Sequence, residues 1–532
     1  MCSAPAIVGD ARHDAQDAWL WQRARLTPHA AALRFERDGS EESPALDYAA
    51  LAREAETAAL RLLALGVARG DRIAVHMASH PRLVALLHAA QKLGAVLVPL
   101  NTRLPSCELT PLLEHAAPRL LLADDVAPLA NVFHGVDCID VHRDFDRVPI
   151  AKSAILPPHI DPGAPWMIVY TSGTTALPKG VVLSNANHFA AAAGSRQRLG
   201  HGAGEVWLAT LPLYHVGGLA ILARAVLEGS RVDLSSGFDA ARVRRVIENG
   251  PATMISLVPT MLARLLEMPP AAHSKLRCLL IGGAALSPAL ARRALESGLP
   301  IAVTYGLSEA CSQVCTTLPG STDATDGSVG TALSCVGVRI DSPADDGIGE
   351  LLVRGPNVTS RYFRNDAANT AAFAEPPVAP APGASLPQQA DLHVGRWLRT
   401  GDLASIDAQG RVHIACRRSD LIVSGGENIV PSQVETVLEE HPAVRECAVF
   451  GIDDPEWGQR VIALVAPRVD HSMDVADVTA ELTAWCRERL AAYKTPRVFR
   501  FVHALPRNAT GKVDRRALPE AWEAARPAGE RS

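Results

Sequence analysis

The chain has 532 residues, of which 48% are hydrophobic and 20% are charged, so it is long enough to bury a large core and too apolar to be disordered. Its formal net charge of −5 argues against a surface built mainly to bind nucleic acid or anionic membranes. No segment reaches the roughly 18 uninterrupted apolar residues that a membrane-spanning helix needs, so we expect no integral membrane association.

Cysteine and lysine usage narrow the class further. Ten cysteines are scattered along the chain without a C-x-x-C pair, which is typical of reduced thiols rather than of disulfides or a zinc site. Asp10, Arg12 and Asp14 stand where a secretory signal would be apolar, so we expect a cytoplasmic protein. Only six of the 52 basic residues are lysines, and two of these, Lys179 and Lys512, lie in the motifs described below.

Up to about residue 415, short apolar runs alternate with helical patterns. Most runs are nearly continuous, as expected of strands that are covered on both faces. The predicted strands are 72–77, 95–100, 166–170, 252–258, 276–281 and 301–304, and the predicted helices are 46–65 and 288–297. This order predicts an α/β fold with a large N-terminal domain of packed, mostly parallel sheets and helices.

The pattern changes towards the C-terminus. Five prolines within 374–391 predict an extended surface loop. From about residue 416 the chain has the character of a compact α+β segment. We therefore predict an N-terminal domain over 1–416, a hinge over 417–420 and a small C-terminal domain over 421–532.

The elements of the small domain can be placed individually. Ser432 and Glu435 form a capping-box pair that predicts a helix over 433–440. Two β-rich runs, 446–452 and 461–466, follow it. The next predicted helix carries Val478, Leu482 and Trp485 on one face and ends before Pro496.

The strongest local signal is a loop of hydroxyls and glycines directly after the predicted strand 166–170. It reads Thr171-Ser172-Gly173-Thr174-Thr175 and is followed by Lys179-Gly180. Backbone N–H groups freed by glycine, hydroxyl donors and an ammonium group are what a polyphosphate requires. The Walker A pattern is absent, and a polar turn is the alternative, but this residue order favours a phosphate-binding loop.

Two further turns carry groups that suit a nucleotide. Tyr305, Gly306, Ser308 and Glu309 follow the predicted strand 301–304; a tyrosine can stack on a base, a hydroxyl can reach a phosphate and a carboxylate can bind Mg²⁺. Asp402 lies beyond the tight turn at Gly401 and can accept hydrogen bonds from ribose hydroxyls. Taken alone, each segment is also typical of an ordinary strand-end turn or a solvated aspartate.

The last two motifs lie at the proposed hinge and near the C-terminus. The first runs from Arg417 through Ser419 to Gly425-Gly426, and the second is Pro506-x4-Gly511-Lys512. A lysine on such a loop is usually an exposed charge. Because lysine is scarce in this chain, a functional role for Lys512 is favoured.

In this order and spacing, the five segments resemble the adenylate-forming superfamily of acyl-CoA synthetases, luciferases and non-ribosomal adenylation domains. The resemblance extends over nearly the whole chain, from about residue 20 to residue 518. Within the superfamily the chain is most similar to o-succinylbenzoate–CoA ligases. This likeness rests on Leu211-Pro-Leu-Tyr-His215, Ser308-Glu-Ala-Cys-Ser-Gln313, Arg417-Arg-Ser-Asp-Leu-Ile with Ser424-Gly-Gly-Glu-Asn-Ile, and Pro506-Arg-Asn-Ala.

The resemblance implies an activity, its cofactors and roles for single residues. A carboxylate would attack the α-phosphorus of ATP, in the presence of Mg²⁺, to give acyl-AMP and pyrophosphate, and CoA would then displace AMP. The implied roles are phosphate binding by Thr171, Ser172, Gly173, Thr174, Thr175, Lys179 and Ser308; Mg²⁺ binding by Glu309; adenine stacking by Tyr305 beside Gly306; a border of the adenine and acyl pocket by Gly283 and Ala284; and ribose binding by Asp402 and Arg417.

Four further roles follow from the same resemblance. Lys512 would contact the acyl carboxylate and the α-phosphate in the first step, where two anions must approach each other. His215 would stand beside the acyl pocket as a gate, although a buried structural histidine is equally consistent with the sequence. Ser419 would be the hinge about which the small domain rotates between the steps, and rotation would bring Gly425 and Gly426 beside the tunnel for the thiol arm of CoA.

The expected partners are a small carboxylic acid, ATP and CoA, without nucleic acid, for a monomer or homodimer. We predict an aryl acid such as o-succinylbenzoate, which implies a place in menaquinone biosynthesis. A medium-chain fatty or other aryl acyl-CoA synthetase is the alternative within the enzyme class, and a luciferase-like oxygenase shares the motifs. The alternative from another class is a non-catalytic adenylate-binding sensor, but a sensor would be expected to lack Glu309 or Lys512, and both are present.

Overall fold

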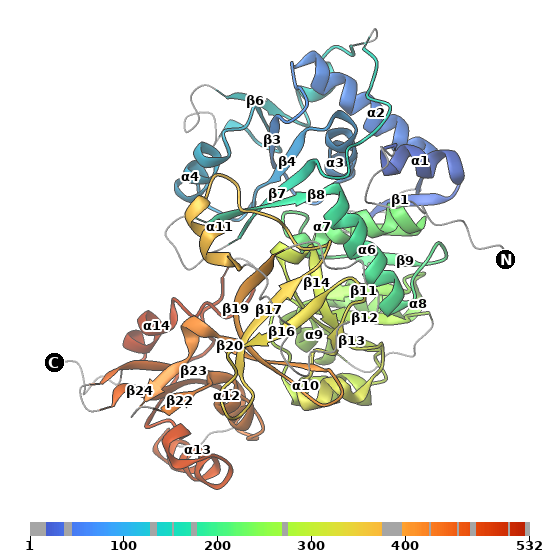
Figure 1. The fold of residues 1–532 in the computed structure, drawn as a ribbon. Coiled ribbons are helices and arrows are strands. Elements are labelled where there is room, and N and C mark those ends of the chain that lie inside the picture. Colours follow the sequence, from blue (N-terminus) through green and yellow to red (C-terminus); the bar gives the residue numbers. More distant parts are fainter. Residues whose placement is uncertain are drawn as a thin grey trace.

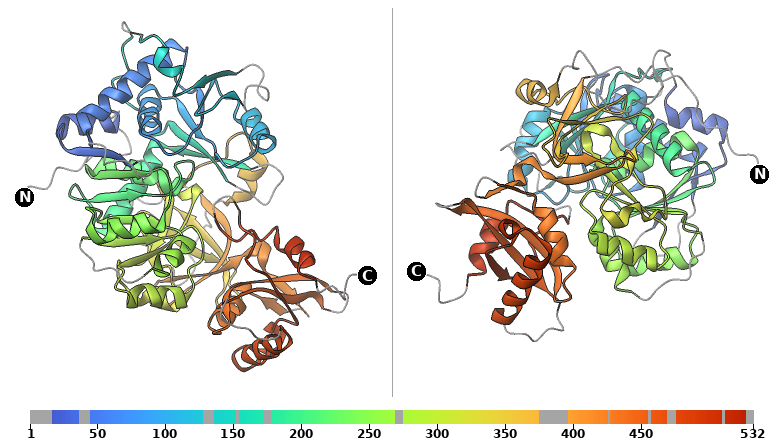
Figure 2. Two further views of the ribbon diagram at one scale, coloured as in Figure 1. Left: turned by 180° about the vertical axis from the view of Figure 1, so that it is seen from behind. Right: turned by 60° about the horizontal axis from the view of Figure 1, so that its bottom comes forward.

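The computed structural model describes residues 17–36, 45–127, 136–151, 154–171, 178–268, 275–374, 396–424, 427–454, 457–468, 475–508 and 511–526. Figure 1 shows a large lobe and a small lobe; the small lobe, orange to red at the lower left, contains the chain beyond β20 (Val412–Arg417). The views in Figure 2 agree that the small lobe lies at one side of the large lobe. Among the described residues, no helix combines the length and the apolar character needed to cross a membrane.

The first sheet of the large lobe has the strand order β6-β5-β3-β4-β7-β8. Its strands run parallel, except that β8 returns antiparallel to β7. All residues of β4 and β5 are buried, as the continuous apolar runs predict. The elements of this part are α1 (Trp19–Leu26), α2 (Tyr48–Ala64), β3 (Arg72–His76), α3 (Pro81–Leu93), β4 (Val96–Pro99), α4 (Ser106–Ala116), β5 (Leu120–Ala123), β6 (Asp137–Asp140), η1 (Phe145–Arg147), β7 (Pro165–Thr171) and β8 (Lys179–Ser184).

The second sheet has the order β15-β14-β13-β12-β11-β9-β10-β1-β2. Its central strands, from β1 to β13, are parallel, and the edge strands β2, β14 and β15 are antiparallel. The elements are β1 (Ala31–Glu36), β2 (Leu46–Asp47), α6 (Asn185–Leu199), β9 (Val206–Ala209), α7 (Val216–Glu228), β10 (Arg231–Ser235), α8 (Ala240–Asn249), β11 (Met254–Leu257), α9 (Pro259–Leu266), β12 (Cys278–Ile281), α10 (Pro288–Glu296), β13 (Ile301–Leu307), η2 (Ser308–Ala310), β14 (Ser312–Thr316), η3 (Thr322–Asp326) and β15 (Thr331–Ala332).

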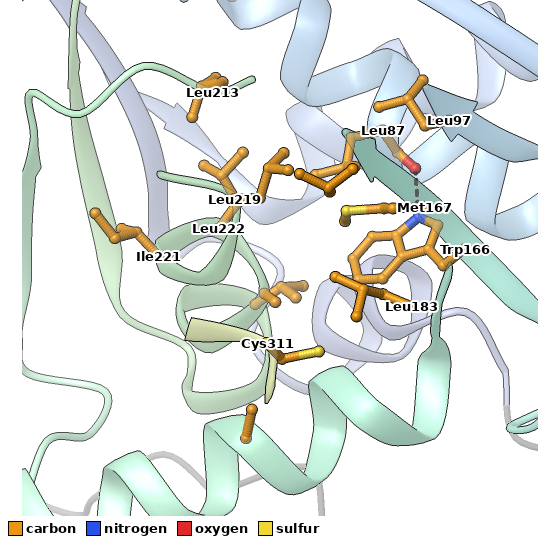
Figure 3. Packing of buried hydrophobic residues seen from close by; sticks show 14 of the residues in the cluster. Leu87, Leu97, Trp166, Met167, Leu183, Leu213, Leu219, Ile221, Leu222 and Cys311 are labelled. Atoms are coloured by element: carbon orange, nitrogen blue, oxygen red, sulfur yellow. Dashed lines mark hydrogen bonds between the residues drawn. The ribbon is translucent and has the colours of Figure 1, made fainter. Parts of the chain in front are cut away.

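These two sheets share one hydrophobic core. Trp166 of β7 packs edge-on against Trp19, with ring centroids 5.2 Å apart. Its indole Nε1 donates a hydrogen bond of 3.0 Å to the backbone oxygen of Leu87 in α3 (Figure 3). Leu219 and Leu222 of α7 belong to the same buried cluster, so the helix after β9 packs against the first sheet as well as the second.

A third sheet joins the large lobe to the small one, and it is antiparallel throughout, with the order β16-β17-β19-β18 and β20 paired with β19. No strand of this sheet was predicted from the sequence. Two of its strands, β19 and β20, are interrupted by partly buried polar residues and lack the continuous apolar runs of the parallel sheets. The elements are β16 (Gly337–Asp341), β17 (Gly349–Arg354), α11 (Asp366–Ala372), β18 (Phe373–Ala374), β19 (Trp397–Ile406) and β20. The predicted proline-rich loop lies outside the described residues from residue 375 onwards.

The small lobe holds a sheet of order β22-β21-β24-β23, with β25 parallel to β24. The strands and helices predicted for this part of the chain are present to within a few residues. The elements are η4 (Arg418–Asp420), β21 (Ile422–Ser424), β22 (Glu427–Ile429), α12 (Pro431–Glu439), β23 (Val444–Asp454), β24 (Gly458–Pro467), α13 (Val475–Arg489), η5 (Ala492–Lys494), β25 (Val498–Phe501) and α14 (Leu518–Ala524).

The predicted capping box at the start of α12 is wrong. The helix begins at Pro431 and has no side-chain cap hydrogen bond. The Ser432 hydroxyl donates instead to the backbone oxygen of Ala415, and Glu435 Oε1 accepts a 2.8 Å hydrogen bond from the Val449 N–H. A proline in the first turn starts the helix, and both polar side chains bind outside it.

Candidate active site

Lys512 lies at the end of a tight turn in the small lobe. Arg507 and Val513 form an antiparallel bridge across this turn. The Asn508 N–H donates to the Lys512 carbonyl at 2.9 Å, and the Lys512 N–H donates to Asn508 Oδ1 at 3.1 Å. Gly511 has a φ of 82°, which suits glycine. The Pro-x4-Gly-Lys pattern therefore encodes a turn that presents the lysine side chain.

The Lys512 side chain reaches the large lobe. A Cβ atom on Gly283 would lie 3.7 Å from Lys512 Cε and 3.9 Å from its Nζ. Gly283 has a φ of 83°, and both it and Ala284 are exposed. Beside the same turn, Thr260 Oγ1 would lie 3.8 Å from a Cβ on Gly511. The Gly283 loop after β12 and the start of α9 thus form the surface against which the lysine turn docks.

Asp402 and Arg417 face each other on β19 and β20. Arg417 Nε lies 2.8 Å from Asp402 Oδ1, and the Tyr305 hydroxyl donates to Oδ2 of the same carboxylate. Burial raises the pKa of Asp402, while Arg417 opposes this rise. Burial and the charge of Arg417 lower the pKa of Lys512, while Asp402 opposes that shift. The four side chains therefore form one electrostatic cluster.

The hydroxyl-rich motif connects β7 to β8. Thr171 at the end of β7 pairs with Lys179 at the start of β8, and the Thr171 hydroxyl donates to the Lys179 carbonyl at 3.4 Å. Ser172, Gly173, Thr174 and Thr175 lie outside the described residues. The structure thus gives the two ends of the predicted phosphate-binding loop.

Ser308 and Glu309 lie in η2, directly after β13. A Cβ on Gly306 would lie 1.6 Å from the Ser312 carbonyl oxygen, so only glycine fits there. The turn continues through Cys311 at φ 53° and Ser312 at φ 100°, a region that residues other than glycine rarely adopt. The backbone that carries Glu309 is therefore tightly constrained, as is common at functional sites.

Tyr362, which the sequence analysis did not single out, contacts both of these segments. Its hydroxyl donates to Glu309 Oε1 at 2.9 Å, and Lys179 Nζ lies 5.1 Å from the centroid of its ring. The residue is buried, at 4% exposure. No local pattern marks it, because its contacts arise only when distant segments meet in the fold.

The chain matches the model of AMP-binding enzymes over residues 20–363 and that of the AMP-binding enzyme C-terminal domain over residues 433–512. The chain belongs to the AMP-binding enzyme family. It is 36% identical, over 94% of its length and 98% of the relative, to a 2-succinylbenzoate–CoA ligase of Bacillus licheniformis. The predicted superfamily, and within it the likeness to these ligases, are confirmed.

Solved structures from Bacillus subtilis resemble this AMP-binding enzyme over 95% of its chain. The o-succinylbenzoate CoA synthetase in complex with the acyl-adenylate intermediate OSB-AMP has a TM-score of 0.82 at 35% identity, with 98% of that chain covered. The same synthetase in complex with ATP and magnesium ion has a TM-score of 0.81 at 34% identity, with 100% of that chain covered. A double mutant of this synthetase bound with its product analogue OSB-NCoA has a TM-score of only 0.67, at 35% identity and with 98% of that chain covered.

In this AMP-binding enzyme, His215 immediately precedes α7 and caps it without a side-chain hydrogen bond. Its ring centroid lies 4.7 Å from that of Tyr214. Burial, and then the charges of Lys512 and Arg103, lower the pKa of His215 to about 4, so the ring is neutral near pH 7. Its Nε2 is buried and has no hydrogen-bond partner among the described residues.

The predicted hinge residue Ser419 is the middle residue of η4, and its hydroxyl donates to Asp420 Oδ1 at 3.1 Å. On one side of η4, Arg418 lies 3.4 Å from Glu350 of the large lobe. On the other side, Asp420 lies 3.4 Å from Arg515 of the small lobe. This segment therefore makes ion pairs with both lobes. Gly425 and Gly426 lie outside the described residues.

Glu309 is the candidate metal ligand. The described residues contain no group of three or more His, Cys, Asp or Glu side chains that could bind a metal by themselves. A single carboxylate fits Mg²⁺, which usually takes one or two protein carboxylates and completes its shell with water and substrate phosphates. Glu309 and Lys179 both contact Tyr362, so a carboxylate and the ammonium predicted to bind phosphate converge on one place.

Proposed function

We propose that this protein is an ATP-dependent acid–CoA ligase that acts on 2-succinylbenzoate. The observation that carries the proposal is the position of Lys512, whose ammonium lies at the Gly283 loop and within the electrostatic field of Asp402 and Arg417. The extensive identity to 2-succinylbenzoate–CoA ligases supports the choice of acid.

In the first half-reaction, a substrate carboxylate attacks the α-phosphorus of ATP and pyrophosphate leaves. Two anions must approach each other, and negative charge grows on the bridging oxygen. The Lys512 ammonium offsets both effects. Its lowered pKa fits this role, because burial makes an unpaired ammonium costly and a bound anion relieves that cost.

The remaining residues hold the nucleotide. Lys179 and the loop Thr171–Ser172–Gly173–Thr174–Thr175 take the β- and γ-phosphates, and Ser308 takes a further phosphate. Asp402 and Arg417 take the ribose. Because the Tyr305 hydroxyl is bound to Asp402, its ring is fixed at the ribose site, where its face can stack on adenine beside Gly306. Gly283 and Ala284 border the pocket, with His215 on the acyl side.

Mg²⁺ held by Glu309 would neutralise charge on the phosphates and pyrophosphate when it is bound. In the second half-reaction, the thiol of CoA attacks the acyl carbon of acyl-AMP, and AMP leaves with the bonding electron pair. The Lys512 ammonium is not required there.

We propose that the small domain, 421–532, rotates about Ser419 in the hinge 417–420 relative to the large domain, 1–416. Rotation withdraws Lys512 and brings Gly425 and Gly426 to the CoA channel. Two observations support this proposal. The present arrangement places Lys512 at the large lobe, and the TM-score falls from 0.82 for the acyl-adenylate complex to 0.67 for the complex with the CoA product analogue.

Other aryl or medium-chain acids are the alternative substrates. The proposed location is the cytoplasm, since the scattered cysteines favour a reducing compartment. The proposed oligomeric state is a monomer or homodimer. A pyrophosphate-release screen with a panel of aryl and alkyl acids tests the substrate, and 2-succinylbenzoate should give the highest kcat/KM. Another acid with a higher value would replace it.

The assignment of Lys512 to the first half-reaction alone is tested with Lys512→Ala. We expect acyl-AMP formation to fall by about 10²–10³-fold, the usual cost of removing one charge-stabilising donor, while thioester formation from supplied acyl-AMP stays near the wild-type rate. Lys494→Ala is the matched control, since Lys494 is a partly buried lysine of the same lobe whose Nζ donates to Gln433 Oε1 at 2.9 Å. Equal losses in both half-reactions would refute the assignment.

A further inference from the structure

Tyr362 lies in the connection between β17 and α11, which joins two parts of the proposed site. On one side, the Phe363 N–H donates to the Gly180 carbonyl at 2.7 Å, and Tyr362 forms a β-bridge with Val181 of β8. On the other side, the Thr359 N–H donates to the Glu309 carbonyl at 2.7 Å. The backbone around Tyr362 is therefore fixed to the phosphate-loop hairpin and to the turn that carries Glu309.

The Tyr362 side chain contacts the same two segments, through its hydroxyl and through its ring. The hydroxyl donates to Glu309 Oε1 at 2.9 Å, and this bond fixes the direction of a carboxylate that stands on an already rigid turn. The ring lies under the Lys179 ammonium, with 5.1 Å between Nζ and the centroid. A cation held over an aromatic ring is attracted by the electron-rich face, more strongly where water is excluded.

Packing also holds Tyr362 in one orientation. The Tyr362 N–H donates to Asn369 Oδ1 at 2.6 Å, and its ring lies 6.1 Å from that of Phe373, centroid to centroid. With 4% exposure, the side chain has little freedom to leave these contacts.

We propose that Tyr362 is a positioning residue for ATP and its metal ion: its hydroxyl orients Glu309 and its ring orients Lys179. The proposal rests on the proposed function, because it takes Glu309 as the metal ligand and Lys179 as a phosphate ligand. One side chain then sets the spacing between the metal and the phosphate-binding ammonium. The two parts of the residue are separable by mutation.

The test measures the affinity for ATP by titration calorimetry, with Mg²⁺ and with EDTA, so that its readout is binding. Tyr362→Phe removes only the hydroxyl. We expect the gain in ATP affinity from Mg²⁺ to fall about tenfold, the effect of losing one hydrogen bond to a charged group, with metal-free affinity unchanged. Tyr362→Leu also removes the ring, and metal-free affinity should then fall about threefold as well.

Tyr493→Phe is the matched control, because it removes a hydroxyl from an exposed tyrosine, 41% accessible, in the small lobe. It should change neither affinity. A double-mutant cycle excludes a merely structural effect: in a Glu309→Ala background, Tyr362→Phe should have no further effect on the gain from Mg²⁺. Circular dichroism confirms that each variant is folded.

An unchanged gain from Mg²⁺ in Tyr362→Phe, or an undiminished effect of that variant in the Glu309→Ala background, would overturn the inference. So would a wild-type protein whose affinity for ATP does not depend on Mg²⁺. Failure of the proposed function looks different: the wild type would bind ATP in a metal-dependent way yet form no CoA thioester with any acid of the panel.

Discussion

Glu439, at the end of α12 in the small lobe, has an unusual environment that makes stability depend on pH. Burial, and then the negative charge of Glu435 and Glu446, raises the pKa of Glu439 to about 7, while a hydrogen bond with the Ser287 side chain opposes the rise. Ser287 is the N-cap of α10 in the large lobe, so the carboxyl lies at the contact between the lobes. Replacing Glu439 by glutamine keeps the shape and removes the charge.

The magnitude follows from the pKa. A rise from the ordinary value of 4.5 to about 7 corresponds to an upper limit of about 3 kcal/mol, and the part of the side chain that meets solvent reduces this to about 1–2 kcal/mol. The folded protein binds this proton more tightly than the unfolded chain. Stability from this group is therefore complete below about pH 4.5, declines as the pH rises towards 7 and stays low above it.

We therefore expect Glu439→Gln to stabilise the protein by about 1–2 kcal/mol at pH 8 and by much less at pH 5. Urea unfolding followed by circular dichroism at both pH values measures the difference. Glu440→Gln is the control, because it makes the same charge change at the next residue, which is exposed and lies 4.0 Å from Arg292. A gain of equal size at both pH values, or a loss of stability at pH 8, would refute the reasoning.

Two further substitutions probe the site and the core. Gly283→Ala places a methyl group 3.7 Å from Lys512 Cε on a residue with φ 83°, so pyrophosphate release should fall at least about tenfold; a wild-type rate would show that the loop tolerates the side chain. Trp166→Phe removes the buried hydrogen bond to Leu87, and urea unfolding should show a loss of about 1–3 kcal/mol. An unchanged unfolding midpoint would mean that the core reorganises around the smaller ring.

Much of the large lobe could be predicted because buried parallel strands leave a strong local signal. The run at 166–170, for example, corresponds to β7, whose central residues are all buried. Strand β20 of the antiparallel sheet could not be found in this way, since it is only partly buried and so carries a mixture of polar and apolar residues. The capping box predicted at Ser432 is wrong for a related reason: the Ser432 hydroxyl donates to the Ala415 carbonyl, a tertiary contact that no local pattern reveals.

In the candidate site, too, some residues stand in local motifs, whereas the contacts between them arise only in the fold. Motifs identified Asp402, Arg417 and Lys512, because each stands in a short segment with characteristic neighbours. The contacts that join the site residues are tertiary contacts. Examples are the hydrogen bond from the Tyr305 hydroxyl to Asp402 and the position of Tyr362 between Glu309 and Lys179. Side chains of this second kind act through geometry, so they become visible only when the strands and turns are assembled.

The contact between the lobes lacks a shared hydrophobic core. Within the described residues, no hydrophobic cluster contains side chains of both lobes: one set of clusters ends at Val412 and the other begins at Ile422. The contacts between them are polar, as between Arg292 and Glu440. Polar interfaces lose less on exposure to water than apolar ones, which favours relative motion. A polar contact of this kind suits the proposed rotation, in which the small lobe would withdraw Lys512 between the two half-reactions.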